Sequence, residues 1–191
     1  FVDKRAPETI KRYGDPFFQN QNGTEWISSN TTVSLWSEDP EPHPSGVNAT
    51  YWRTTLVNDT NCWQPDVCQQ AQGEGNWNKL GDMHVDFTIR EDSCHLIEFF
   101  AVDNVNKTEE VNKQCVFVDN KAPEPNKTVG EPKELWDGKD SKFYPNETQH
   151  CWDGTGQEIE CWKVTISTPV TLDCRDSEPH PVDHNKVWFN I

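Results

Sequence analysis

Alternating apolar and polar residues give the most regular part of this chain a period of two, which is typical of β-strands. Val33, Leu35 and Ser37 fall on one side of such a strand, and Ser34 and Trp36 fall on the other. The same period predicts further strands over residues 47–53, 85–89, 94–103 and 111–118. We therefore predict an all-β protein built from antiparallel sheets.

The segment 94–103 is the most apolar of these predicted strands. Its residues Ile97, Phe99 and Ala101 share one side, and we expect them in the core. No stretch has a convincing helical period. The long polar segment from about 56 to 83 reads as an excursion within the first domain that disulfides hold in place.

The chain also repeats itself. The run Phe-Val-Asp-Lys-Arg-Ala-Pro at residues 1–7 returns as Phe-Val-Asp-Asn-Lys-Ala-Pro at 117–123, and Glu-Pro-His-Pro at 41–44 returns at 178–181. The offsets are 116 (117 − 1) and 137 (178 − 41), so the second copy carries about 21 extra residues. We predict one domain over 1–116 and the first half of a second over 117–191. Downstream chain or a neighbouring subunit would complete the second.

The formal net charge of −15 argues against a nucleic-acid partner and suits divalent cations. No apolar stretch approaches the roughly 20 residues of a membrane helix, and no signal peptide is recognisable. We therefore expect no transmembrane segment, and a processed or internal N-terminus.

Glycosylation sequons of the form Asn-X-Thr are far more frequent than the composition would give by chance. Their asparagines are Asn22, Asn30, Asn48, Asn58, Asn106, Asn126 and Asn146. The alternative is ordinary Asn- and Thr-rich loop chemistry. We predict a chain with N-linked glycans, outside the cell or on its surface.

Seven cysteines are consistent with an oxidising compartment, and none of their spacings is that of a zinc cluster. Nearness in the chain suggests three disulfides, between Cys62 and Cys68, between Cys94 and Cys115, and between Cys151 and Cys161. The spacing does not prove this connectivity. Cys174 remains over, either unpaired or bonded to another subunit.

Three runs resemble the tandem immunoglobulin-like repeats of microbial, especially archaeal, surface proteins. They are Tyr-Trp-Arg at 51–53, Phe-Thr-Ile at 87–89 and the segment 95–104, each module beginning with Val-Asp as at 2–3 and 118–119. The resemblance implies tandem immunoglobulin-like antiparallel β-sandwiches, the second incomplete within this chain. It also implies scaffolding or adhesion rather than catalysis.

The repeat places Cys174 opposite Ser37 (174 − 137), on the core side of its strand. In immunoglobulin sandwiches, a cysteine on this early strand pairs with one on a late strand of the facing sheet. Either downstream chain supplies that strand or a neighbouring copy donates it. Repeated donation would produce a head-to-tail homopolymer, that is, a filament.

Calcium is the metal that this fold would suit best. In an immunoglobulin sandwich, the module linker and the loops after the second and sixth strands meet at one end, and oxygen ligands gather there. The candidates are Asp3, Asp39, Glu41, Asp103 and Asn104, with Asp119, Asp176 and Glu178 in the second copy. The alternative is that these are solvated turn residues.

No catalytic motif is recognisable, and we expect no enzyme. His43 and His180 share a Glu-Pro-His-Pro context, which favours a structural role over metal binding. We predict a structural subunit of a glycosylated filament or surface rod. Two alternatives remain: an accessory module of a larger secreted enzyme, and an adhesin or carbohydrate-binding module. The second would use Trp63, Trp77, Trp136 or Trp152.

Overall fold

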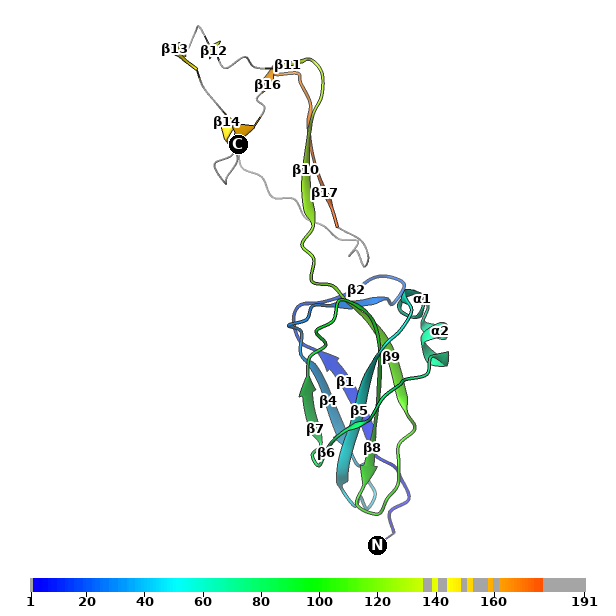
Figure 1. Ribbon diagram of the computed structural model, residues 1–191. Helices are drawn as coiled ribbons and strands as arrows, with labels where there is room; N and C mark the ends of the chain where they lie inside the picture. Colours follow the sequence, from blue (N-terminus) through cyan, green and yellow to red (C-terminus); the bar gives the residue numbers. More distant parts are fainter. Residues whose placement is uncertain are drawn as a thin grey trace. The chain divides into compact units, whose positions relative to one another are not determined.

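The computed structural model describes residues 2–135, 139–140, 144–148, 151–152, 158–159 and 162–176 (Figure 1). These residues divide into two units. Unit 1 comprises the residues up to Ala122 together with Asp176, and unit 2 comprises the described residues between Pro123 and Arg175. Strands dominate both units, which confirms the all-β prediction. Among the described residues, no helix is long and apolar enough to span a membrane.

The first sheet of unit 1 has three antiparallel strands in the order β1 (Glu8–Tyr13), β4 (Val33–Glu38) and β7 (His84–Phe87). Its central strand β4 is the alternating strand predicted from the sequence. Val33 and Leu35 are completely buried. Trp36, which lies between Leu35 and Ser37, is 49% exposed. One face of this sheet therefore faces the core, and the other faces solvent.

The second sheet has six strands. Their order is β2 (Phe17–Gln19), β3 (Glu25–Ile27), β9 (Asn112–Val118), β8 (Ser93–Asp103), β5 (Val47–Leu56) and β6 (Asn78–Leu80). All neighbours run antiparallel except β3 and β9, which are parallel. The predicted strands at 33–37, 47–53, 85–89, 94–103 and 111–118 thus correspond to β4, β5, β7, β8 and β9.

Apolar side chains from both sheets form one core. The three-stranded sheet contributes Val33, Leu35 and Val85, and the six-stranded sheet contributes Ile27, Ile97, Phe99, Val116 and Val118. Unit 1 is therefore a two-layered β structure whose core lies between its sheets.

Strand β8 is buried on both of its faces. Ile97 lies in the core between the sheets, while Leu96, equally inaccessible to solvent, lies in a second cluster with Trp26 and Phe117. This second cluster is covered by two short helices, α1 (Asp59–Trp63) and α2 (Pro65–Gln70), which the sequence pattern did not predict. Pro65 begins α2, and Asn58 caps α1 by accepting a hydrogen bond from the Thr60 N–H.

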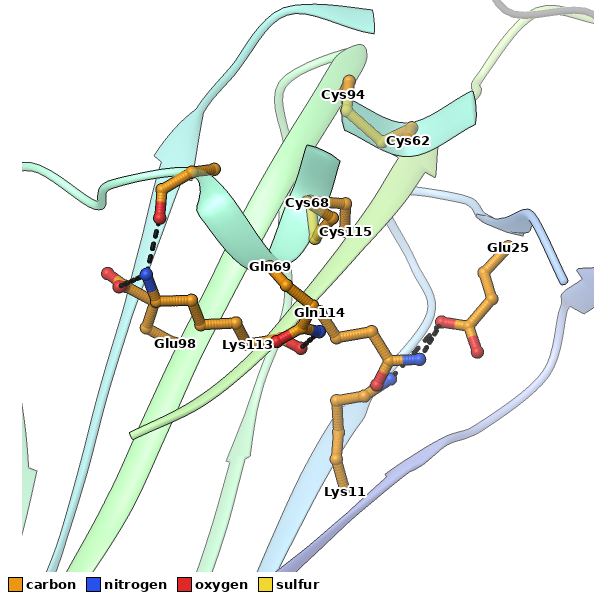
Figure 2. Close-up of a disulfide and its surroundings, with 11 residues drawn as sticks. Lys11, Glu25, Cys62, Cys68, Gln69, Cys94, Glu98, Lys113, Gln114 and Cys115 are labelled. Atoms are coloured by element: carbon orange, nitrogen blue, oxygen red, sulfur yellow. Dashed lines mark hydrogen bonds and ion pairs between the residues drawn. A yellow bond between two sulfur atoms is a disulfide. The ribbon is translucent and has the colours of Figure 1, made fainter. Parts of the chain in front are cut away.

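Two disulfides attach these helices to the sheet, as Figure 2 shows. Cys62 of α1 is bonded to Cys94 of β8, and Cys68 of α2 is bonded to Cys115 of β9. The excursion at 56–83 is therefore held by disulfides, but the predicted pairs Cys62–Cys68 and Cys94–Cys115 are wrong. Because the helices lie over the strands, each helix cysteine is bonded to a cysteine of the strand beneath it. Along the strands, Cys94 is opposite Phe117 rather than Cys115.

Unit 2 contains four two-stranded antiparallel sheets in its described part. Their strands are β10 (Glu124–Val129) with β17 (Val170–Arg175), β11 (Lys133–Leu135) with β16 (Trp162–Val164), β12 (Lys139–Asp140) with β13 (Tyr144–Thr148), and β14 (Cys151–Trp152) with β15 (Glu158–Ile159). Cys161 lies outside the described residues, so the predicted Cys151–Cys161 bond stays a prediction. Cys174 is a free thiol.

Candidate functional site: the open strands of unit 2

The β10–β17 strand pair of unit 2 has the same register as the β1–β4 strand pair of unit 1. Strand β1 pairs with β4 from Glu8↔Glu38 to Tyr13↔Val33. Adding 116 to the β1 numbers and 137 to the β4 numbers gives the observed pairing of β10 with β17, residue by residue. These are the two offsets that the sequence motifs show.

The second strand pair follows the same rule. Phe17↔Ile27 in the β2–β3 pair becomes Lys133↔Val164 in the β11–β16 pair, again with offsets of 116 and 137. Between β2 and β3 lie five residues, 20–24, and between β11 and β16 lie 26 residues, 136–161. The difference of 21 residues places the insertion of the second copy at this single connection.

Side-chain hydrogen bonds at the turns repeat as well. In unit 1, the Thr31 hydroxyl donates to the carbonyl of Pro16 at 2.6 Å. In unit 2, the Thr168 hydroxyl donates to the carbonyl of Pro132 at 2.5 Å. Since 168 − 31 is 137 and 132 − 16 is 116, equivalent residues hold equivalent turns. The likeness of the two copies therefore extends from the backbone register to side-chain contacts.

In unit 1, strands β3 and β4 each pair with a further strand. Their counterparts β16 and β17 have no such further neighbour in the described part of unit 2. Strand β3 pairs in parallel with β9, and β4 pairs in antiparallel orientation with β7. For β16 and β17, no corresponding third strand occurs among the described residues. In the part of the chain that the structure describes, β17 therefore pairs with a strand on one side only, and an edge of this kind can accept a further strand.

The apolar residues beside these open edges are exposed. Val164 is 50% exposed, whereas its counterpart Ile27 in unit 1 is 3% exposed. Val170 is 54% exposed, whereas its counterpart Val33 is completely buried. In unit 1, residues of β7, β8 and β9 cover these positions. Strands like these would bury the same face of unit 2.

Cys174 lies on this same open face, on the strand that pairs with Pro125. Its counterpart Ser37 is buried, and the Ser37 hydroxyl is hydrogen-bonded to the hydroxyl of Thr50 on β5 at 2.9 Å. A completed unit 2 would therefore place Cys174 against the counterpart of β5. The comparison with immunoglobulin sandwiches had instead predicted a late strand at this place.

Six predicted glycosylation sites have side chains that the structure describes, and all six are exposed. They are Asn22, Asn30, Asn48, Asn58, Asn106 and Asn126. Asn146 lies in β13, and its side chain is outside the described set. Glycans on the six exposed asparagines would extend into solvent without displacing the core.

Of the predicted calcium ligands, Asp3, Asp39 and Asp103 come together in unit 1, with one carboxylate oxygen from each within 4.8 Å of the others. Glu41 is outside this group, and Glu41 Oε2 accepts a hydrogen bond from the N–H of His43. Asn104 instead fixes the adjoining loop through its side-chain amide. In the second copy, Asp119 and Asp176 are described, and Glu178 lies outside the described residues.

The predicted binding tryptophans that the structure describes pack against other aromatic rings, although Trp63 is still 41% exposed. Trp63 contacts the rings of Trp26 and Phe117, and Trp77 lies edge-on to Phe100. Trp136 and the side chain of Trp152, like the whole of His180, lie outside the described residues. Trp36 was not among the predicted binding tryptophans, although its outward place in the alternation of β4 could have indicated it.

Comparison with known proteins adds no family. No family model, no curated protein and no solved structure matches this chain.

Proposed function

We propose that this protein is a structural subunit of an N-glycosylated extracellular filament or surface rod, built from tandem immunoglobulin-like modules. Copies join head to tail, and a neighbouring copy donates the strands that complete unit 2. An antiparallel strand would pair along 170–173, the counterpart of the segment that β7 covers in unit 1.

One observation carries this proposal: unit 2 repeats the first four strands of unit 1 in register, with its apolar face open. Isolated two-stranded sheets are marginally stable in water, and further strands over the apolar face are needed for independent stability. An open edge of this kind binds an added strand through backbone hydrogen bonds, and the apolar positions give the interaction its specificity.

The surface of the chain supports an extracellular rod. The two disulfides described above suit an oxidising compartment, and the six exposed sequons suit a glycosylated surface. The net charge of −15 keeps free subunits apart. Glycans and charge would together restrict association to the open strands.

Two substitutions on neighbouring residues of β17 test this assembly. Leu172→Asp places a charge on the core-facing side, and Thr171→Asp places the same charge on the outward side. The purified chain is examined by sedimentation velocity and negative-stain electron microscopy in about 0.15 M NaCl, where repulsion between distant surface charges is screened. We expect fibres from the wild type and Thr171→Asp, and monomers from Leu172→Asp. Monomers of the wild type, or fibres of Leu172→Asp, would contradict strand donation.

An adhesive function has one specific observation in its favour. Trp36 is 49% exposed, its ring stacks on His84 at 3.9 Å, and it lines an open groove with Ile10 and Arg12. An exposed aromatic ring beside polar groups can stack on a sugar. Glycan-array binding that Trp36→Ala abolishes would support an adhesin.

A further inference from the structure

Three carboxylates meet at one end of unit 1, although they come from distant parts of the sequence. Asp3 precedes β1, Asp39 follows β4, and Asp103 is the last residue of β8. One oxygen of each carboxylate lies within 4.8 Å of the other two. Among the described residues, no lysine or arginine forms an ion pair with any of the three.

Asp103 is the most deeply placed of the three, because its side chain is completely buried. Its Oδ1 accepts hydrogen bonds from the backbone N–H groups of Val105 at 2.8 Å and Lys107 at 2.7 Å. Its Oδ2 is also inaccessible to solvent and has no hydrogen-bond partner. A buried carboxylate oxygen without a partner is costly, so this atom requires an explanation.

Asp39 also accepts hydrogen bonds through only one of its two carboxylate oxygens. Its Oδ2 accepts from the N–H of Gly46 at 2.7 Å, while its Oδ1 is buried and without a partner. Asn104 holds this loop in place by donating to the carbonyls of Ser45 and Gly46 at 2.8 and 3.0 Å. Asp39 and Asp103 are thus each fixed through one oxygen, and the other oxygen of each has no hydrogen-bond partner.

Asp3 connects the segment before β1 to this arrangement. Its Oδ1 accepts from the N–H of Arg5 at 3.1 Å, and its Oδ2 accepts from the N–H of Ser45 at 2.9 Å. These two hydrogen bonds hold the Asp3 carboxylate beside the loop that contains Ser45.

We propose that Asp3, Asp39 and Asp103 form a Ca²⁺ site that fastens the entry segment of the module to both of its sheets. Calcium prefers carboxylate and carbonyl oxygens and takes six to eight of them, so water would complete its shell. The cation would pair the two unsatisfied oxygens and offset the repulsion among three negative charges. It would join residue 3 to the ends of β4, in the three-stranded sheet, and β8, in the six-stranded sheet.

The repeat extends this inference to the second copy. Asp119 corresponds to Asp3 (119 − 116), and Asp176 corresponds to Asp39 (176 − 137). The third carboxylate would come from the counterpart of β8, which a completing strand must supply. Calcium binding at the second site would therefore accompany strand completion, whereas the first site requires unit 1 alone.

Calcium titration of the chelator-treated full chain by isothermal calorimetry tests the first site, whether or not the chain polymerises. The test variants are Asp103→Asn and Asp39→Asn, which nearly preserve side-chain size. The control is Asp86→Asn, which removes an exposed carboxylate of the same unit. We expect one site per chain in the unassembled wild type and control, and a second site only on assembly. In the test variants, binding at the first site should be at least about tenfold weaker, because ligand charge sets affinity.

Melting temperatures show whether a variant has lost only its calcium site or is also less stably folded. In chelator, Asp103→Asn should melt no lower than the wild type, since it removes one of three repelling charges. In calcium, the melting temperature of the wild type should rise, and that of Asp103→Asn should not. Equal calcium binding by wild type and Asp103→Asn, or no binding beyond diffuse surface association, would overturn the proposal.

Discussion

Removing one disulfide can distinguish the pairing in the structure from the pairing predicted from nearness in the chain. We consider the double variant Cys68→Ala/Cys115→Ala, which removes one bridge and leaves the Cys62–Cys94 bridge intact. The lost bridge closes a separation of 47 residues, and the remaining one closes 32. The chain-entropy relation assigns about 4 kcal/mol to either bridge, and a few tenths more to the longer loop.

That loss should lower the melting temperature of unit 1 by about 12–20 °C, given the size of the unit. Loss of the two buried sulfur atoms adds a smaller cost, because the rest of the cluster around Trp26 and Phe117 remains. Calorimetry measures the shift, and it can follow the Cys62→Ala/Cys94→Ala variant as a matched control. The two variants should lose nearly equal stability.

Counting thiols in denaturant without reductant supplies the decisive readout. If the bridges are those in the structure, either double variant has the same number of free thiols as the wild type. If Cys62 were bonded to Cys68 and Cys94 to Cys115, each double variant would release two additional thiols. Two extra thiols would refute the arrangement in which the helices are fastened to β8 and β9.

Three further predictions follow from burial and charge. Burial lowers the pKa of Lys11 to about 8, from 10.5, with Glu25 opposing the shift. The unfolded chain then binds more protons than the folded chain above about pH 8, so urea titrations should show stability rising from pH 7 to about 9.5. This rise should disappear in Lys11→Met. Leu35→Ala should cost about 3 kcal/mol, but Leu172→Ala below about 1 kcal/mol in unassembled chain, because only Leu35 lies in a closed core. Asn48→Gln should remove the mass of one glycan with no change in melting temperature, since the side chain is exposed.

Much of unit 1 could be predicted from the period of its apolar residues. The alternation of β4 identified which side chains are buried, and the apolar run of β8 identified a core strand. The pattern did not predict that Leu96 is as deeply buried as Ile97 on the opposite face. Burial of both faces depends on α1 and α2, and helices of five or six residues are too short to show a helical period.

The prediction of the cysteine pairs was wrong for a related reason. Proximity along the chain favours local bridges, but the partner of each cysteine depends on which strand lies beneath the helix. By contrast, the acidic centre could be approached from the sequence, because Asp39 and Asp103 lie at the ends of predicted strands and Asp3 lies in the repeated Val-Asp motif. Excluding Glu41 from this centre required the structure, in which Glu41 Oε2 accepts a hydrogen bond from the N–H of His43.

We propose that unit 2 repeats the first four strands of unit 1 and takes its remaining strands from a neighbouring copy. Cryo-electron microscopy of the native assembled material can show where those strands come from. We expect a fibre in which a strand of the next subunit runs antiparallel to β17. Density in which this edge of β17 stays unpaired, or is covered by a strand of the same chain, would contradict strand donation.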